Sequence, residues 1–215
     1  MVVDWGGVLT ERLDLATLRW AEQEGIDVVA YLGAMRSWLD PAQSGTQRSD
    51  PQQPNPVHAL ERGELSQPEF ERMLAERAAA HGIHVVGEGL LQRMFATFDD
   101  APAMSALVVR ARAAGLRTAL LSNSWGNDYQ RDGWDDMFDE VVISGEVGLR
   151  KPELAIFTLV CRRLGVAPAE CVFVDDQAHN VEAAAALGMT GVLHTSYDES
   201  AARLEALFEV RLSGG

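Results

Sequence analysis

The chain has 215 residues, which suits one core domain of ordinary size with a modest insertion. Its 47% hydrophobic content is typical of a globular protein with a packed core. The formal net charge of −14 opposes binding to nucleic acid and to anionic membrane surfaces, so an anionic small ligand needs a local positive site.

No apolar run approaches the ~20 residues that a membrane-spanning helix needs. The first residues carry neither the basic segment nor the apolar segment of an export signal. Cys161 and Cys171 are too few for a disulfide framework, and we expect both to be buried thiols in a reducing compartment. The sequence therefore favours a cytoplasmic location, with no nucleic-acid partner and no membrane partner.

The N-terminal part of the chain combines one short strand with a long helical region. Residues 1–4 are predicted to form a strand that ends at Asp4, and the three residues before Asp4 leave open a native start further upstream. Amphipathic patterns predict helices over Leu13–Glu24 and Val28–Leu39. Residues 40–56, rich in Pro, Gln, Ser and Asp, are predicted to be an irregular loop.

Another helix signal follows this loop. Ser66 and Glu69 have the spacing of a capping box, in which the serine side chain and the glutamate side chain each bind a main-chain amide. The pattern predicts a helix that starts there and ends at about His81. The side chains predicted to face inward are Phe70, Met73 and Leu74.

From residue 101 onward, helix-like and strand-like segments alternate, which is typical of a parallel sheet with helices on both faces. Gly115, Gly165 and Gly188 follow helical patterns, where glycine commonly ends a helix. We therefore predict an α/β fold with a Rossmann-like parallel sheet. The predicted helices are 102–114, 153–164, 178–187 and 199–208, and the predicted strands are 117–121, Glu140–Ile143, 171–174 and Thr190–Leu193.

Polar residues of catalytic types lie just past the ends of three predicted strands. Asp4 closes the first, Ser122 closes the second, and Asp175 with Asp176 closes another. Open α/β sheets bind ligands at the carboxyl ends of their strands, so these side chains should meet in one crevice. Together with Lys151, which opens a helix-like stretch, they form a set suited to a phosphate and a divalent cation.

Together, these residues resemble the four motifs of the haloacid dehalogenase superfamily of phosphohydrolases, in that family's order and at sensible spacing. The motif residues are Asp4, Ser122, Lys151 within Gly148-Leu149-Arg150-Lys151-Pro152, and the pair Asp175-Asp176. The resemblance spans the whole chain and implies a catalytic core of residues 1–12 and 98–215, with a first-type helical cap over residues 13–97. Asn55-Pro56 and residues 60–66 resemble the branch that includes the N-terminal phosphatase domains of soluble epoxide hydrolases.

The resemblance implies a catalytic role for each motif residue. Asp4 is the expected nucleophile, and its aspartyl-phosphate would split one hard displacement into two easier ones. Ser122 and Asn123 are expected to bind phosphoryl oxygens together with Lys151. The charge of Lys151 is also expected to stabilise the transition state.

The resemblance also implies a metal site. The expected cofactor is Mg²⁺, because hard oxygen ligands that leave positions for water and phosphate favour this ion. Its implied ligands are the carboxylate of Asp4, the main-chain carbonyl of Gly6, and the pair Asp175-Asp176. One acid of the pair is expected to ligate the ion while the other orients Lys151 or acts through water, and the sequence does not assign which.

Several residues near the motifs have weaker expectations. Asn180 matches a further family position and is expected to support the Asp175-Asp176 loop. Arg150 is expected at the surface. Trp5 and Trp125 stand beside motif residues, and packing between cap and core is favoured over a role in lining the substrate entrance.

One catalytic part is missing from the motifs. Phosphatases of this family usually carry a second Asp two residues after the nucleophile, which protonates the leaving group, and here that position is Gly6. Loss of a general acid typically lowers the rate ~10²–10⁴-fold. The substitute acids considered, His179 foremost because it titrates near neutrality, are Thr10, Glu11, Asp128 and His179.

We expect an enzyme: a Mg²⁺-dependent phosphomonoesterase of a small phosphorylated metabolite, with activity lowered by the missing acid. The alternative is a catalytically impaired relative that binds a ligand or a partner, a reading that Gly6 motivates. A 2-haloacid dehalogenase is less favoured, because those relatives need no metal and lack the carboxylate pair that Asp175 and Asp176 provide.

Overall fold

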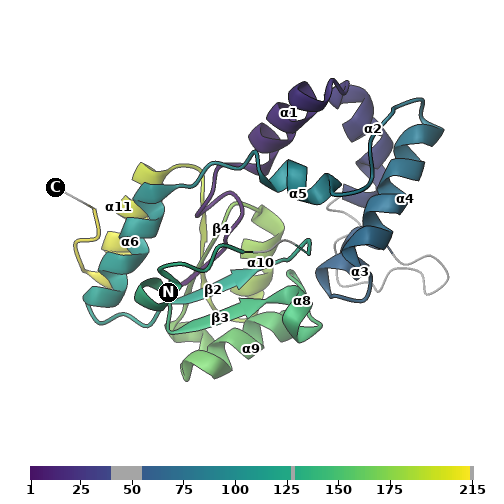
Figure 1. Ribbon diagram of the computed structural model, residues 1–215. Coiled ribbons are helices and arrows are strands. Elements are labelled where there is room, and N and C mark those ends of the chain that lie inside the picture. The colour runs from purple at the N-terminus through teal and green to yellow at the C-terminus, as the bar shows by residue number, and fades with distance from the viewer. Residues whose placement is uncertain (40–54, 127–128, 214–215) are drawn as a thin grey trace.

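A computed structural model describes residues 1–39, 55–126 and 129–213 (Figure 1). Its centre is a five-stranded sheet with the order β3-β2-β1-β4-β5, in which every neighbouring pair is parallel. The predicted Rossmann-like α/β fold is confirmed. The strands are β1 (Val2–Val3), β2 (Ala119–Ser122), β3 (Glu140–Ile143), β4 (Val172–Asp175) and β5 (Thr190–Leu193). We call the sheet and the helices from α6 onward the sheet unit. These helices are α6 (Pro102–Ala113), α7 (Trp134–Met137), α8 (Ser144–Val147), α9 (Leu154–Leu164), α10 (Ala178–Ala186) and α11 (Tyr197–Phe208).

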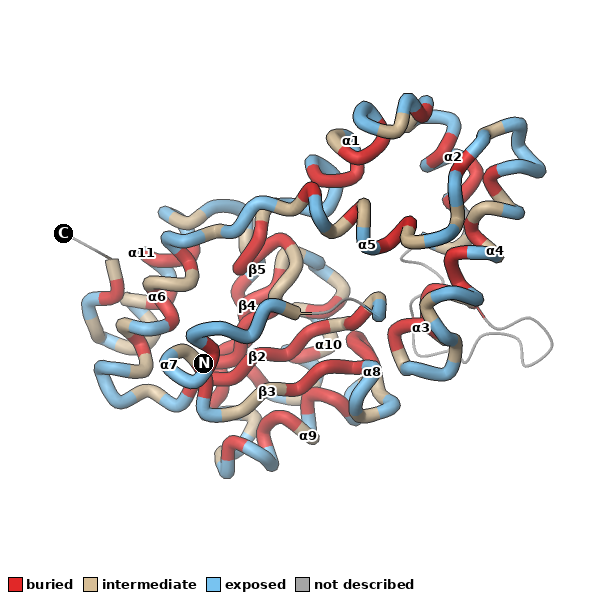
Figure 2. The backbone as a smooth tube through the Cα atoms, in the orientation of Figure 1, coloured by how far each residue is buried: buried red, intermediate tan, exposed pale blue. Residues whose placement is uncertain are grey.

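Both faces of the sheet are covered, because successive residues of a strand point to opposite faces. In β1, Val3 belongs to an apolar cluster with α6 and α11, whereas Val2 belongs to a cluster with α9 and α10. Figure 1 shows α6 and α11 on one side of the sheet and α9 on the other. The central strands β1, β2 and β4 are buried along their whole length, whereas the edge strands β3 and β5 are buried only in part (Figure 2). Burial on both faces explains why these strands read as continuous apolar runs.

Between β1 and α6, the described residues form five helices in a separate layer, which we call the helical insert (Figure 1). It has an apolar core of its own, which includes Trp20, Phe70, Leu74 and Leu91, all almost fully buried. Trp20 packs edge-on against Tyr31 at a centroid distance of 5.0 Å. The helices are α1 (Leu13–Glu24), α2 (Val28–Leu39), α3 (Pro56–Glu61), α4 (Gln67–Ala80) and α5 (Leu90–Phe95).

The structure corrects the sequence reading at two places in the insert. Pro56 starts α3 instead of ending a loop, because the Asn55 side chain accepts from the amide of Val57 at 2.9 Å and proline suits the first turn. Residues 40–54 of the predicted loop lie outside the described residues. Ser66 is the N-cap of α4, but its side chain makes no capping hydrogen bond, so the predicted capping box is not formed.

The α4 glutamate that binds main-chain amides is Glu71 rather than Glu69. Glu71 is buried and accepts from the amides of Gly89 and Leu91 at 3.1 and 2.9 Å, which ties α4 to the start of α5. Phe70 and Leu74 face inward as predicted, whereas Met73 is only half-buried. The short helices α3, α5, α7 and α8 were not predicted, since four to six residues carry too little periodicity.

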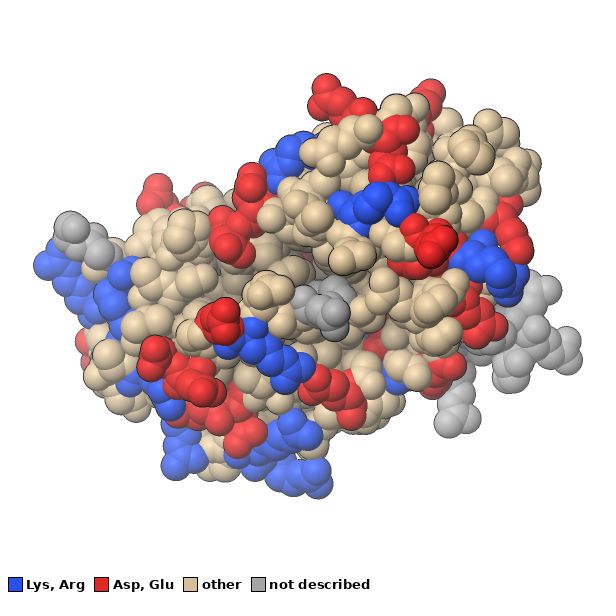
Figure 3. Space-filling model, viewed as in Figure 1, with Lys and Arg blue, Asp and Glu red and all other residues tan. Residues whose placement is uncertain are grey.

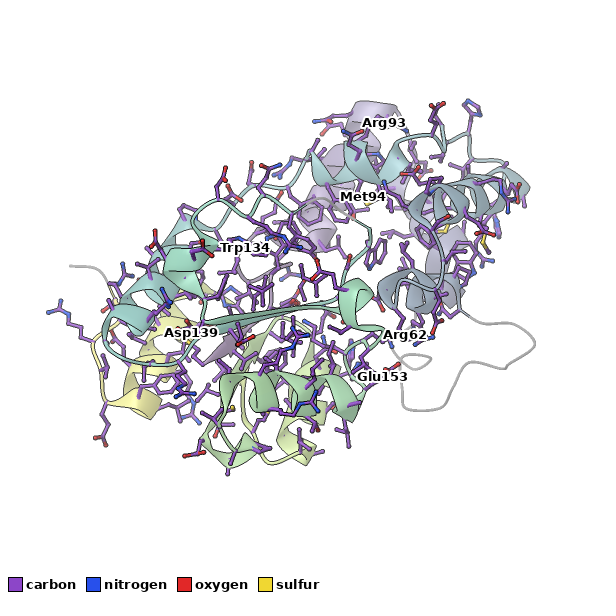
Figure 4. The ribbon with its side chains drawn as sticks, turned by 60° about the horizontal axis from the view of Figure 1, so that its bottom comes forward. Arg62, Arg93, Met94, Trp134, Asp139 and Glu153 are labelled. Atoms are coloured by element: carbon purple, nitrogen blue, oxygen red, sulfur yellow. The ribbon has the colours of Figure 1, made fainter. Side chains whose placement is uncertain are left out.

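The insert is joined to the sheet unit by a buried ion pair. The Arg150 guanidinium binds the carboxylate of Glu61, and the side chains are 6% and 8% exposed. The expectation that Arg150 lies at the surface is therefore wrong, because Glu61 compensates its charge. Nearby, Arg62 of the insert and Glu153 of the sheet unit pair at 2.9 Å (Figure 4).

The remaining bulk expectations concern thiols, charge and membrane spans. Cys161 and Cys171 are both buried free thiols, as predicted. Their sulfur atoms lie 3.5 Å apart. Acidic and basic side chains are interspersed on the face that Figure 3 shows. Within the described residues, no helix combines the length and the apolar character needed to cross a bilayer.

We predict that Glu61→Ala lowers the free energy of unfolding by about 3–5 kcal/mol, because it leaves the Arg150 charge buried without a partner. Glu64→Ala is the matched control: it removes an exposed partner of Arg62 and should cost less than ~1 kcal/mol. Urea unfolding followed by circular dichroism measures both values. Equal stability of the two variants would show that the Arg150–Glu61 pair does not hold the insert in place.

Candidate active site

The predicted motif residues meet at the carboxyl ends of the three central strands. Asp4 directly follows β1, whose neighbours β2 and β4 end at Ser122 and Asp175. A cavity of about 300 Å³ lies over these strand ends and is lined by Asp4, Gly6, Ser122 and residues of the helical insert. Parallel strands present their carboxyl ends on one edge, which is why residues 4, 122 and 175 become neighbours.

Lys151 is the electrostatic centre of this cavity. Its ammonium group lies 2.7 Å from an oxygen of Asp4 and 2.7 Å from an oxygen of Asp175, and its side chain is 1% exposed. Burial lowers the pKa of Lys151, but the carboxylates of Asp175 and Asp4 outweigh burial and raise its pKa above the ordinary value. The lysine therefore carries a fixed positive charge at the end of the sheet.

The two adjacent acids have different surroundings. Asp175 is fully buried, and its Oδ2 accepts from Lys151 while its Oδ1 accepts from the amide of Gln177 at 2.8 Å. The side-chain amide of Asn180 donates to both oxygens at 3.1 and 3.2 Å. Asp176 is half-buried, and Gln177 donates to its Oδ2 at 2.9 Å.

Three carboxylates, those of Asp4, Asp175 and Asp176, present oxygen atoms within 4.8 Å of one another. Burial raises the pKa of Asp4 to about 8, although Lys151 opposes this rise. Burial, together with the charge of Asp175, raises the pKa of Asp176 to about 6. Such crowding of acids is relieved by a cation, and an all-oxygen donor set suits Mg²⁺.

Two consecutive glycines shape the loop after Asp4 for different reasons. Gly7 has a φ of 73°, and a Cβ there would lie 2.4 Å from Oδ2 of Asp176. Only glycine lets the main chain approach the acid this closely. At Gly6, by contrast, a Cβ would meet nothing within 4 Å. The position of the missing acid is therefore open space.

Ser122 and Asn123 differ in how their side chains are used. The side-chain nitrogen of Asn123 donates to the main-chain carbonyl of Lys151 at 3.1 Å. Its side-chain oxygen accepts from the main-chain amide of Lys151 at 2.8 Å. Its side chain thus positions the lysine, which leaves its main-chain amide for the predicted phosphate binding. The Ser122 hydroxyl shares a 3.0 Å hydrogen bond with the hydroxyl of Tyr129. Nothing in the sequence pattern pointed to Tyr129, since it lies seven residues away in an irregular segment.

The structure describes three of the four residues considered from sequence as substitute acids. His179 lines the cavity half-buried, and burial lowers its pKa. Thr10 accepts from the amide of Gly7 at 3.2 Å and donates to the carbonyl of Glu11 at 3.1 Å, so its hydroxyl is engaged. Glu11 pairs with Arg19. Asp128 lies outside the described residues.

His58 of α3 also lines the cavity and was missed by the sequence reading. It is buried, and desolvation together with the nearby charge of Arg150 lowers its pKa to about 4. The imidazole is therefore neutral at physiological pH and offers a hydrogen-bonding group rather than a charge. Its only sequence signal was its place beside the Asn55-Pro56 run.

A second cavity, of about 520 Å³, adjoins the first. The two share wall residues that include Trp38, Val57, Trp125 and Asp176. Trp125 also packs edge-on against Phe70 at 5.9 Å and donates to Glu61 at 3.2 Å. The tryptophan therefore packs against the insert, as favoured from sequence, and lines the cavities as well.

Comparison with known proteins places the chain among hydrolases. Residues 1–188 match the family model described as haloacid dehalogenase-like hydrolase. A drimenol cyclase of Aspergillus calidoustus is 33% identical over 154 residues, which cover 69% of this chain and 29% of the cyclase. A sesquiterpene phosphatase of Aspergillus oryzae is 32% identical over 94 residues, which cover 41% of this chain and 47% of the phosphatase. The matched region spans less than half the length of either relative.

A solved structure has the same fold. It is a HAD family enzyme from Bacteroides thetaiotaomicron, a wild-type protein in complex with magnesium and inorganic phosphate. The TM-score is 0.57, with 20% sequence identity over 89% of this chain and 91% of that chain. This likeness supports the architecture of sheet and insert.

We predict that Gly7→Ala lowers the free energy of unfolding by about 1–3 kcal/mol, because alanine is strained at this φ and its Cβ displaces Asp176. Gly6→Ala is the matched control one residue away and should change stability by less than ~1 kcal/mol. Thermal or urea unfolding of both variants measures the difference. If Gly7→Ala were as stable as Gly6→Ala, the close approach to Asp176 would not constrain the loop.

Proposed function

We propose that this chain, which belongs to the haloacid dehalogenase-like hydrolase family, is a Mg²⁺-dependent phosphomonoesterase of small phosphorylated compounds. One observation carries the proposal: the Lys151 ammonium lies 2.7 Å from both Asp4 and Asp175, with Asp176 beside them, at the carboxyl end of a parallel sheet. A phosphatase relative supports the same class of reaction.

In the proposed reaction, Asp4 attacks phosphorus. Its Oδ1 accepts from the amide of Trp5 at 2.7 Å and from Lys151, while no described residue donates to its Oδ2. Oδ2 is therefore the oxygen that forms the new bond to phosphorus as the bond to the ester oxygen breaks. Water then hydrolyses the aspartyl-phosphate and releases phosphate. Lys151 and Ser122 hold the phosphoryl oxygens in both steps.

The residues present fit a Mg²⁺ ion. Asp175 has both oxygens engaged by Lys151, Gln177 and Asn180, so we assign it to orienting the lysine. Asp176, together with Asp4 and the carbonyl of Gly6, would hold the ion. When bound, Mg²⁺ supplies charge neutralisation between the carboxylates and the phosphoryl group.

We assign residues 13–97 to a cap over a catalytic core of residues 1–12 and 98–215. Support comes from the insert residues Trp38, His58 and Glu61, which line the cavity that also contains Asp4. A cap over the strand ends restricts substrate size and excludes water from the reaction.

The missing acid restricts the proposed chemistry. No carboxylate stands at Gly6 to protonate the departing oxygen, so the enzyme should favour leaving groups that need little protonation. The alternative, a protein that binds metal and phosphate without turnover, differs from the phosphatase in a directly measurable way.

We predict Mg²⁺-dependent phosphate release from a panel of small phosphomonoesters, and its loss to the background rate in Asp4→Asn. Removal of Mg²⁺ with a chelator should abolish turnover, and added Mg²⁺ should restore it. Circular dichroism of Asp4→Asn checks that the fold persists. Mg²⁺ binding without turnover in the unaltered protein would favour the binding module instead.

We predict that Gly6→Asp raises kcat for alkyl phosphates ~10²–10⁴-fold, because the open space at this position admits a general acid. For an aryl phosphate with a good leaving group, kcat should change little. Gly6→Asn is the matched control, with the same shape but no transferable proton. An equal gain in Gly6→Asn would show that the effect is not acid catalysis.

A further inference from the structure

The larger cavity is a mostly apolar chamber that is partly open to solvent. Its walls include Met35, Phe70 and Leu74, each no more than 2% exposed, and Met94 of α5, which Figure 4 labels. Other wall residues are more exposed, among them Leu32 at 44% and Leu193 at 45%, so the space of about 520 Å³ is in contact with solvent. An apolar ligand would remove the apolar surface of these walls from water, which is favourable, so an apolar ligand suits this space.

The polar side chains of the chamber are mostly engaged with other protein groups. Arg12 pairs with Asp14 at 2.8 Å, the Thr17 hydroxyl donates to a carbonyl at 2.7 Å, and His194 shares a 2.8 Å hydrogen bond with Ser200. Arg12 and Asp14 compensate each other, and the further carboxylate on the wall, that of Asp176, disfavours an anionic group in the chamber. A hydroxyl on the wall, that of Tyr31, has no hydrogen-bond partner among the described residues and is available to one polar group of a ligand.

The chamber is continuous with the phosphate site. Trp38, Val57 and Trp125 line both cavities, and Asp176 of the carboxylate cluster is also a wall of each. A ligand with its phosphoryl group at Asp4 therefore extends its other end into the chamber. A phosphate head alone leaves the chamber empty.

We propose that the chamber binds the hydrocarbon tail of the substrate, and that the enzyme acts on phosphorylated long-chain apolar alcohols. At about 30 Å³ for each heavy atom, on the order of water's share of liquid volume, the chamber accommodates a tail of roughly 15 heavy atoms. This inference rests on the proposed phosphatase function and names its substrate class.

Two head groups share this chemistry: a monophosphate ester and a diphosphate ester of the same alcohol. The glycine at position 6 favours the diphosphate, because its departing group is an alkyl phosphate that needs little protonation. In that reaction the bond from Asp4 to the terminal phosphorus forms while the bond to the bridging oxygen breaks, and the electron pair stays on the departing phosphate.

The test is a series of n-alkyl monophosphates and n-alkyl diphosphates of increasing chain length, assayed for kcat/KM with Mg²⁺. We expect kcat/KM to rise about fourfold for each methylene, the equivalent of ~0.8 kcal/mol per buried CH₂, until the chamber is full. The two arms identify the head group. Turnover that does not depend on chain length in either arm overturns the tail proposal and leaves the phosphatase intact.

Binding of n-alkyl phosphonates, which cannot be hydrolysed, separates the two proposals. Calorimetry should show Kd falling with chain length whether or not esters are turned over. Chain-length-dependent binding without any turnover supports the chamber and refutes the phosphatase. Binding that is independent of chain length overturns the chamber.

A pair of tryptophan variants locates the tail. Leu32 lines the chamber and is 44% exposed, so Leu32→Trp should fold and reduce the space. We expect kcat/KM for the longest chains to fall about 16-fold, the equivalent of two buried methylenes, and to fall less for short esters. Leu15→Trp is the matched control, since Leu15 is 48% exposed and lines neither cavity. Equal effects of both variants would contradict the placement of the tail.

Discussion

The site depends on one buried ammonium group among three carboxylates. Without Lys151, the acids at positions 4, 175 and 176 would repel one another in a space with little water. The lysine neutralises part of that charge, and burial raises the pKa values of Asp4 and Asp176 although Lys151 opposes the rise. A divalent cation would relieve the remaining crowding of carboxylates, and in the proposed function it would also offset their repulsion of a phosphate group.

The segment that carries this lysine also fixes the helical insert. Arg150, one residue before Lys151, forms the buried pair with Glu61, and Asn123 clamps the main chain of Lys151. One short stretch thus connects the insert, the end of β2 and the carboxylate cluster. A displacement of the insert at Arg150 would reach Lys151 through a single peptide unit, which links the proposed cap to the proposed chemistry.

The proposed substrate site lies where the insert meets the sheet unit. Trp38 and Val57 from the insert and Trp125 from the loop after β2 line both the charged cavity and the apolar chamber. In the proposed function, the charged cavity would hold the phosphoryl group and the apolar chamber would hold the hydrocarbon tail. Gly6 further restricts the leaving group in the proposed reaction, because no carboxylic acid stands at that position to protonate the departing oxygen.

The sequence by itself determined the α/β class, the approximate positions of the longer helices and the meeting of Asp4, Ser122 and Asp175, because apolar periodicity and strand ends are local properties. It did not reveal the burial of Arg150, the bond from Tyr129 to Ser122, or the apolar chamber. Each of these depends on partners that lie seven to 89 residues away in the chain or on packing between the insert and the sheet unit. A charged residue is predicted to lie at the surface unless its buried counter-ion is known, and only the fold shows that counter-ion. A cavity likewise forms only between elements that tertiary packing brings together.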